Sequence, residues 1–230
     1  MDPDQSAELL SRTRLFGGLD HVVLRSLGER TIERSYRKGH LIFSQGDLGE
    51  SLYILVDGMV KVFVTSERGD EMVLTTLHPP EVFGELALID GGPRSASAEA
   101  LEPAAALVLT RPTLLELLAQ HPPLTDSLLR SLGAVLRRLT EQTSDLVFLD
   151  LHGRVAKLLL NLASEQENEE GEIVDLDLHM TQSDLAGMVG GSRQSVNQIL
   201  QYFQGRGYIE LDGRRVKLLR PDLLRRRAGL

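Results

Sequence analysis

The sequence predicts an α+β protein in which a roll of short strands precedes one long helix and a helical part that ends in a hairpin. Residues 31–110 hold short runs rich in Val, Ile, Leu, Phe and Tyr, separated by turns that contain glycine. Residues 125–150 contain no proline and only one glycine. Residues 180–230 hold two short amphipathic segments and a second pair of strands. A length of 230 residues allows one large domain or two ordinary ones.

The composition narrows the function classes. The chain has no cysteine, which excludes disulfides, thiolate nucleophiles and cysteine-ligated metal centres. It shows no signal peptide and no run approaching the ~18 apolar residues that span a bilayer, so we expect a cytoplasmic protein with no membrane partner. The net charge is −8, yet residues 180–230 carry nine Lys or Arg against four Asp or Glu. A basic tail on an acidic body fits a confined DNA-binding face, although a solvated surface would look the same.

The N-terminal part is predicted to be a short helical segment over residues 6–27 followed by a roll. The pair Asp57-Gly58 favours a tight hairpin, because both central positions of that turn favour positive φ. Strands at this spacing indicate a small antiparallel barrel or roll. The predicted strands cover residues 40–43, 51–56, 59–65, 72–77 and 105–110.

A long helix is predicted over residues 125–150, after a shorter one at 111–121 that Pro122-Pro123 ends. Its apolar residues recur at alternating steps of four and three, with Gln142 in one of the places. This heptad seam predicts a parallel coiled-coil homodimer, and the alternative is a single helix packed on its own roll. The seam consists of Leu128, Leu132, Val135, Leu139, Gln142, Leu146 and Leu149.

The C-terminal part predicts a winged helix-turn-helix. A helix at 151–163, an acidic loop at 165–171 and a strand at 173–178 come first. Thr181, with an acidic residue three positions on, predicts a capping box, and Gly190-Gly191 breaks the helix that follows. Ser192 can cap the second helix, which extends to about residue 204. Strands at 208–211 and 215–218, joined by Asp212-Gly213, form the wing.

The second helix of this motif has an outer face made of amides and one guanidinium. Gln194, Asn197, Gln198 and Gln201 recur on one face, with Arg193 at its N-terminal edge. Arginine pairs with guanine and Asn or Gln with adenine, whereas carboxylates, which would repel the duplex, are absent from this face. The helix is therefore predicted to bind DNA base edges, and the alternative is a helix that contacts protein.

The wing adds basic residues to this predicted DNA surface. Arg214, Arg215 and Lys217 are placed for phosphate contacts. The predicted DNA-contacting residues are Thr181, Gln182, Ser192, Arg193, Gln194, Asn197, Gln198 and Lys217.

A further motif connects the chain to a known family. The run FGELALIDGGPRSASAEA, which begins at Phe83, resembles the phosphate-binding cassette of the cyclic AMP receptor protein and of cyclic-nucleotide-dependent kinase regulatory subunits. Together with SRQSVNQIL at 192–200 and FLDLHGRVAKLLLNLA at 148–163, it resembles the CRP/FNR family of transcription regulators over nearly the whole chain.

The resemblance implies a fold and a function. The fold is α+β, with an N-terminal cyclic-nucleotide-binding β-roll, a long dimerisation helix and a C-terminal winged helix-turn-helix, at residues 1–124, 125–150 and 151–230. The function is that of an effector-responsive regulator, not an enzyme, which binds a palindromic double-stranded DNA operator as a homodimer. RNA polymerase is the further partner that the family implies.

The residue types of the cassette suit a cyclic nucleotide, which presents a phosphate anion, a ribose 2′-hydroxyl and a base. Arg94 offers a guanidinium fork for two phosphate oxygens, and Ser95 adds a hydroxyl donor. Gly84 has no Cβ, so the chain can approach the sugar-phosphate closely. The resemblance implies that Glu85 takes the ribose hydroxyl. The alternative is a salt bridge between Glu85 and Arg94 in an empty roll.

The residues expected near the base leave the identity of the effector open. By the resemblance, the two hydroxyl residues that contact adenine fall on Leu139 and Thr140, and the side chain of Leu139 cannot form a hydrogen bond with the base. Cyclic AMP is the effector expected first, and cyclic GMP, a cyclic dinucleotide or a constitutively active form are the alternatives. The predicted effector-binding residues are Gly84, Glu85, Leu86, Arg94, Ser95, Ala96, Leu139 and Thr140; no catalytic residue and no metal ligand is predicted.

Other classes of protein find less support. An enzyme would need a nucleophile–base pair, an HExxH motif or a Walker loop, and the sequence contains none of them. A heme-sensing regulator would need an axial ligand such as His78. A nucleotide-binding adaptor that does not bind DNA would differ from a regulator in a gel-shift assay.

Overall fold

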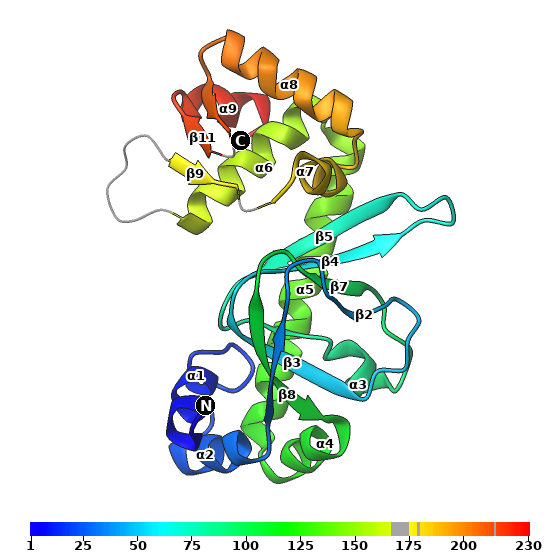
Figure 1. Ribbon diagram of the computed structural model, residues 1–230, viewed down its shortest axis with the longest axis vertical. Coiled ribbons are helices and arrows are strands. Elements are labelled where there is room, and N and C mark those ends of the chain that lie inside the picture. Colours follow the sequence, from blue (N-terminus) through cyan, green and yellow to red (C-terminus); the bar gives the residue numbers. More distant parts are fainter. Residues whose placement is uncertain (167–174, 179, 214) are drawn as a thin grey trace. The chain divides into compact units, whose positions relative to one another are not determined.

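The computed structural model describes residues 1–166, 175–178, 180–213 and 215–230 (Figure 1). These residues form two compact units, Met1–Arg137 and Arg138–Leu230. Within this described part of the chain, no helix combines the length and the apolar character needed to cross a membrane.

The first unit contains a β-roll built from two four-stranded sheets. One sheet has the strand order β1-β8-β3-β6 and the other the order β2-β7-β4-β5. All strand pairs in both sheets are antiparallel. The strands are β1 (Ile32–Tyr36), β2 (Leu41–Phe43), β3 (Ser51–Asp57), β4 (Val60–Thr65), β5 (Glu71–Leu77), β6 (Val82–Phe83), β7 (Ser97–Ala100) and β8 (Ala104–Thr110).

Five of these strands confirm the sequence prediction, whereas β1, β6 and β7 are not predicted. Strand β1 has the sequence IERSY and is largely exposed, because it is an edge strand that pairs only with β8. Strand β7 has the sequence SAEA, whose residues have weak strand propensity, yet it pairs with β2 on one side and β4 on the other. Pairing across the sheet therefore determines the structure of these segments.

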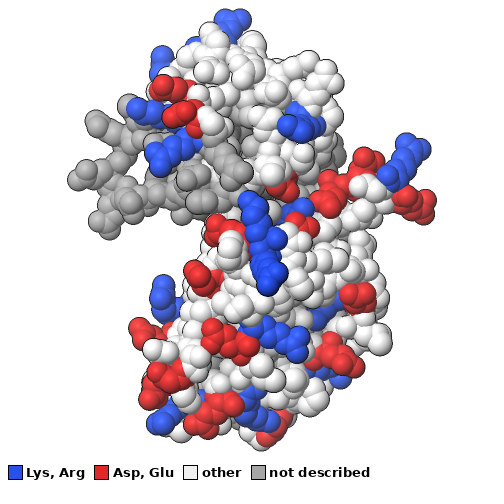
Figure 2. Space-filling view, viewed as in Figure 1, with Lys and Arg blue, Asp and Glu red and all other residues white. Residues whose placement is uncertain are grey.

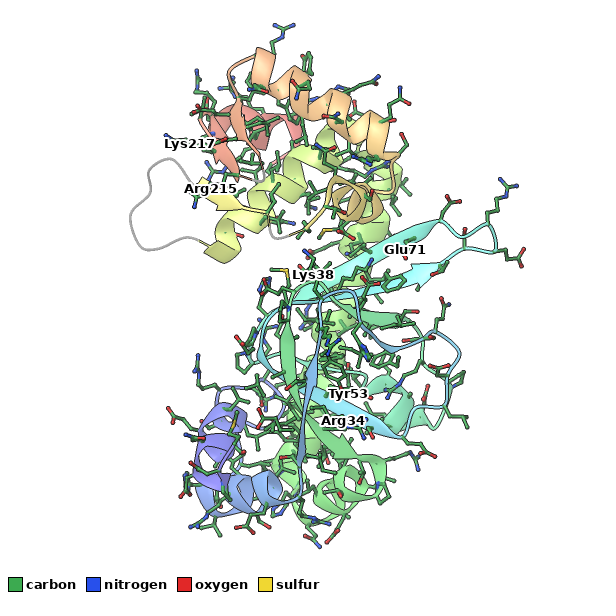
Figure 3. The ribbon with its side chains drawn as sticks, in the orientation of Figure 1. Arg34, Lys38, Tyr53, Glu71, Arg215 and Lys217 are labelled. Carbon is green, nitrogen blue, oxygen red and sulfur yellow. The ribbon has the colours of Figure 1, made fainter. Side chains whose placement is uncertain are left out.

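Strands β3 and β8 are buried on both faces and separate two hydrophobic clusters. Side chains alternate between the faces of a strand. Leu52 and Ile54 consequently pack with helical leucines on one face. Tyr53 and Leu55 point to the other face, into the interior of the roll, where they meet residues of the second sheet. Figure 3 shows Tyr53 on β3.

Two helices precede the roll, and the prediction of one helical segment over residues 6–27 is wrong. The hydroxyl of Thr13 donates to the carbonyl of Leu10 and accepts from the N–H of Phe16. These bonds stabilise a turn that ends the first helix. The helices of this unit are α1 (Pro3–Ser11), α2 (His21–Glu29), α3 (Leu86–Asp90), α4 (Arg111–Gln120) and the larger part of α5 (Pro122–Phe148).

The helix α5 confirms the prediction of a long helix, although it begins at Pro122 and not at residue 125. Pro122 lies in its first turn, because the first residues of a helix need no intrahelical N–H donor. Leu128 belongs to the buried core of the roll unit, and Leu132 packs against it, so both contact their own roll, as the alternative to the coiled coil expects. Farther along the helix, Leu136 is 65% exposed and Leu139 is 41% exposed. Leu136 lies outside the predicted seam, so the exposed apolar surface of α5 differs from that seam.

The second unit is a winged helix-turn-helix. Its sheet has the order β10-β11-β9, and both pairs are antiparallel. Three parts of the sequence prediction lie outside the described residues: residues 167–171 of the acidic loop, residues 173–174 of the predicted strand, and Arg214 of the wing. The elements are α6 (Leu151–Gln166), β9 (Asp175–Asp177), α7 (Gln182–Val189), α8 (Arg193–Gly205), β10 (Ile209–Asp212), β11 (Arg215–Leu218) and α9 (Pro221–Arg227), of which α9 is not predicted.

The predicted caps position α7 and α8. The hydroxyl of Thr181 accepts from the N–H of Asp184 at 3.2 Å, and the Asp184 carboxylate accepts from the N–H of Thr181 at 2.8 Å. Gly190 ends α7 in the left-handed region, at φ 63°. The hydroxyl of Ser192 then accepts from the N–H of Ser195 at 3.0 Å and starts α8. Each cap of this kind stabilises a helix by about 1 kcal/mol.

Candidate functional site

Arg94 lies in the loop between α3 and β7, and its side chain is almost fully buried. Its exposed fraction is 5%. Nη1 donates to the carbonyl of Gly84 at 2.5 Å, and Nη2 donates to the carbonyl of Ser51 at 2.6 Å. Nε is buried and has no hydrogen-bond partner within the part of the chain that the structure describes. Because an unpaired buried N–H costs free energy, this edge of the guanidinium is suited to an acceptor from outside the chain.

Glu85 and Arg94 lie near each other but form no ion pair with each other; the guanidinium donates instead to two carbonyl groups. Burial raises the pKa of the Glu85 carboxyl, and a hydrogen bond from its own main chain and the nearby charge of Arg94 oppose that effect only in part. Burial likewise lowers the pKa of the Arg94 guanidinium. The alternative of a salt bridge in an empty roll is therefore not what the structure holds. Two desolvated groups are available, one suited to an anion and one to a hydroxyl.

Gly84 provides space for the guanidinium. It follows β6 with φ at +77°, a conformation that glycine adopts without strain. A Cβ at this position would lie 2.7 Å from Nη1 of Arg94. Gly49 is equally constrained, because a Cβ there would lie 2.2 Å from the Cβ of Ala87. The sequence predicts that the missing side chain at Gly84 admits a ligand; in this structure it admits Arg94.

The other predicted effector residues divide into two groups. Ser95 is exposed, Ala96 is buried, and Leu86 is exposed at the start of α3, so these three surround Gly84 and Arg94 along the same segment. Leu139 and Thr140 belong to the second unit. The structure therefore brings together the cassette residues of the roll, and the role of the two helix residues stays a prediction.

Sequence reasoning missed four residues that contact or position Arg94. Ser51 supplies a carbonyl, Asp47 supplies another to the main chain, and Phe43 and Tyr53 lie against the guanidinium. These residues are more than 40 positions from Arg94 and form no local motif. Only the pairing of the strands could have indicated them.

The outer face of α8 is exposed in the structure, and its contact with DNA stays a prediction. Its side chains Arg193, Gln194, Asn197, Gln198 and Gln201 are all exposed. The opposite face is buried and consists of Val196, Ile199, Leu200 and Phe203. Figure 2 shows that the visible surface over α8 carries uncharged and basic side chains, in contrast to the mixed charges over the first unit.

The wing carries both signs of charge. Arg215 and Lys217 project from β11 (Figure 3). Lys217 lies opposite Glu210 on β10, and Arg215 lies opposite Asp212. Thr181 and Ser192 are exposed, but their hydroxyl groups already serve the caps of α7 and α8. For these two residues the structure gives a structural role beside the predicted contact with DNA.

No group of three or more His, Asp or Glu residues is arranged to hold a metal ion in the described part of the chain. The two sites are thus an anion-suited cassette in the roll and an amide-rich helix face with one arginine in the second unit.

Comparison with known proteins gives the same division of the chain. Residues 33–121 match the family model described as a cyclic nucleotide-binding domain, and residues 153–227 match the one described as a Crp-like helix-turn-helix domain. The chain is 36% identical over 221 residues to a CRP-like cAMP-activated global transcriptional regulator of Mycobacterium tuberculosis, which covers 96% of this chain and 99% of that protein. The chain belongs to the CRP/FNR family of transcription regulators.

Other CRP/FNR proteins resemble the chain over most of their length. The cyclic AMP receptor protein of Thermus thermophilus is 35% identical over 191 residues, which is 83% of this chain and 85% of that protein. The solved structure of the c-di-GMP responsive global regulator CLP of Xanthomonas campestris has a TM-score of 0.73 and 24% identity, and covers 83% of this chain and 94% of that one. The latter likeness shows the fold alone. The family consists of regulators and not of enzymes, which confirms the non-enzymatic prediction.

Proposed function

We propose that this CRP/FNR regulator binds cyclic AMP in its roll and, as a homodimer, a palindromic operator through α8. The observation that carries the proposal is the buried Nε of Arg94, which lacks an acceptor in the described chain. A cyclic phosphate would supply that acceptor together with a negative charge. The names of the Mycobacterium and Thermus relatives, both of which mention cAMP, support cyclic AMP as the effector.

Each cassette residue has a proposed role. The guanidinium of Arg94 and the hydroxyl of Ser95 donate to phosphate oxygens, and Glu85 accepts from the ribose 2′-hydroxyl. Leu86 and Ala96 contact the sugar-phosphate on either side. Leu139 and Thr140 of α5 come close to the base, where Thr140 can form a hydrogen bond and Leu139 can only pack.

A cyclic dinucleotide or cyclic GMP is the second candidate effector, and Leu139 is the observation that favours it. An aliphatic side chain next to the base removes one hydrogen bond that would select adenine. The Xanthomonas regulator, which has a similar fold, is described as c-di-GMP responsive, and this supports a cyclic dinucleotide as an alternative effector. A form that binds DNA without any effector is the remaining alternative.

Titration calorimetry of the purified protein with cyclic AMP, cyclic GMP and cyclic di-GMP tests the effector. The proposal expects the tightest binding with cyclic AMP, with one ligand for each chain. Tighter binding of either of the other two nucleotides would replace cyclic AMP. No binding of any of the three would overturn the assignment of the cassette.

For DNA binding, we propose that the dimer places two copies of α8 in successive major grooves, about 34 Å apart. Leu136, Leu139 and Leu146 offer exposed apolar surface on α5 for the second copy. We propose three functional parts: the effector-binding roll at residues 1–124, the dimerisation helix at 125–150 and the DNA-binding domain at 151–230. The boundary between the two compact units lies elsewhere, between residues 137 and 138 of α5.

The effector would favour the arrangement of the two units that binds DNA, because a ligand shifts an equilibrium only by its difference in affinity for the two states. The bases would be contacted by Arg193 together with Gln194, Asn197 and Gln198. Two further residues, Gln182 and Lys217, would contact phosphates. RNA polymerase would be the next partner. Selection of binding sites from random DNA, with and without cyclic AMP, tests this proposal. The expected sites are two-fold symmetric and bound more tightly with the nucleotide; sites without symmetry would overturn it.

A further inference from the structure

The segment from Phe43 to Asp47 fixes the main chain of Arg94. The N–H of Arg94 donates to the carbonyl of Asp47 at 2.8 Å, and its carbonyl accepts from the N–H of Gly46 at 2.9 Å. Phe43 is the last residue of β2, where it lies opposite Ala98 on β7. Both main-chain polar groups of Arg94 are thus bonded to one short segment, and Phe43 begins that segment.

The ring of Phe43 also lies against the side chain of Arg94. The Cζ atom of Arg94 is 4.2 Å from the centroid of the Phe43 ring and 5.7 Å from that of Tyr53. A guanidinium at such a distance is attracted to the face of the ring, and more strongly when both are desolvated. The Phe43 ring is itself held by Tyr53, at 5.5 Å between centroids. Tyr53 in turn stacks on Phe83 at 5.1 Å.

These contacts determine which edge of the guanidinium is available. Nη1 and Nη2 donate to the carbonyl groups of Gly84 and Ser51. Phe43 lies over the guanidinium, and Nε is the nitrogen without a partner among the described residues. Rotation about the end of the side chain would break both hydrogen bonds and the ring contact together. The guanidinium therefore presents its Nε edge in one orientation.

We propose that Phe43 is a positioning residue for the effector: its ring holds the guanidinium of Arg94 so that the Nε edge faces the phosphate. This rests on the proposed function of the cassette. Phe43 is partly exposed and packs against the core of the roll, and its ring contacts the guanidinium from there. Phe83 is 3% exposed and stacks in the same aromatic cluster, but it makes no cation–π contact with Arg94 among the described residues.

The chain offers a matched set of variants for the test. Phe43→Leu removes the ring and keeps an apolar side chain, whereas Phe43→Tyr keeps the ring. Phe83→Leu removes a neighbouring ring that does not contact the guanidinium. Calorimetry of the full chain with cyclic AMP measures affinity, and thermal unfolding measures stability. We expect about tenfold weaker binding in Phe43→Leu, from the loss of a partly desolvated cation–π contact, binding within about twofold of the wild type in Phe43→Tyr, and a smaller loss in Phe83→Leu than in Phe43→Leu.

A second measurement reports the orientation of Arg94 without any ligand. In the proton–nitrogen spectrum of the arginine Nε groups, the Phe43 ring should shift the Arg94 resonance, and this shift should vanish in Phe43→Leu and persist in Phe83→Leu. If Phe43→Leu does not fold, Phe43→Met replaces it. Wild-type affinity in the folded Phe43 variant, or an equal loss in Phe83→Leu, would overturn the inference alone. Failure of the wild type to bind any of the three nucleotides would overturn the proposed function as well.

Discussion

The carbonyl oxygen of Gly84 accepts a 2.5 Å hydrogen bond from Nη1 of Arg94, ten positions later in the chain. Gly84 thus provides both an acceptor and, by lacking a Cβ, the space that this nitrogen occupies. A substitution at Gly84 would therefore act on a ligand through Arg94, even if the new side chain never touched the ligand.

Gly84→Ala is expected to weaken both stability and effector binding. The new Cβ would lie 2.7 Å from Nη1 of Arg94, and φ at +77° strains any residue that has a Cβ, by roughly 1 kcal/mol. We expect a lower Tm and at least tenfold weaker cyclic AMP binding by calorimetry. Gly39→Ala is the control, because Gly39 has φ at +76° and a Cβ there would meet no other atom within 4 Å. Gly39→Ala should lower the Tm and leave the affinity for cyclic AMP unchanged. Equal losses of affinity in the two variants would contradict the argument.

Arg94→Gln should abolish most effector binding and leave the fold intact. The anion would lose a charged, bidentate partner in a partly desolvated site, at a cost of about 3 kcal/mol, or roughly a hundredfold in Kd. Arg94→Lys keeps the charge without the fork and should bind with intermediate affinity. Circular dichroism checks the fold and calorimetry the affinity. Unchanged affinity in Arg94→Gln would rule out the cassette as the phosphate site.

Glu85→Gln should stabilise the free protein at neutral pH. Burial raises the pKa of Glu85 above its ordinary value of 4.5, so the native state holds a proton more tightly than the unfolded state does. The free energy of unfolding therefore falls as the pH rises from about 4.5 through the raised pKa. The glutamine variant lacks this decrease. Urea unfolding at pH 4 and at pH 7 should show a difference between the two proteins only at pH 7.

The effector affinity of the same variant separates stability from function. An amide can still accept from a ribose hydroxyl, but without a charge, so binding should weaken only severalfold. A Glu85→Gln protein that is less stable than the wild type at pH 7 would show that the carboxylate has a stabilising partner in solution.

Local chemistry made much of this fold predictable, and long-range contacts made the rest unpredictable. The caps at Thr181 and Ser192 and the two faces of α8 depend on residues within one or two helical turns, which a sequence displays directly. The seam of α5 is ambiguous, because an apolar residue such as Leu128 suits a partner helix and its own roll equally well. The contact between Phe43 and Arg94 joins residues 51 positions apart on different elements, and no local pattern encodes it.

Leu139→Asp should dissociate the proposed homodimer. Leu139 is 41% exposed in the single chain, so a charge there costs little within one copy but would be buried in a paired helix. Leu132→Asp would be a poorer test, because Leu132 packs against its own core and the variant could unfold. Light scattering measures the mass. Val22→Asp on α2, at an 80% exposed position, is the control and should stay dimeric; a dimeric Leu139→Asp would place the interface elsewhere.

Arg193→Ala should reduce both the affinity for DNA and its specificity. Arg193 is exposed at the N-terminal end of α8, the part of a recognition helix that contacts base edges. Loss of a bidentate contact to guanine should cost about 1–3 kcal/mol for each half-site and relax one base position. Gln194 and Gln198 favour adenine, so we expect few G·C pairs beside that guanine. Fluorescence anisotropy with the selected operator and with single-base variants measures both effects.

Lys217→Ala should instead weaken binding to all sequences about equally. Lys217 lies on the wing opposite Glu210 and would contact a phosphate, so its loss removes charge and not sequence information. The slope of log K against log salt concentration should become shallower by about one for each subunit, whereas Arg193→Ala should act mainly on base preference. Gln204→Ala, at the far end of α8, is the control and should leave both the slope and the preference unchanged. A sequence-dependent effect of Lys217→Ala would mean that the wing contacts bases, and an unchanged slope would mean that Glu210 already neutralises this lysine.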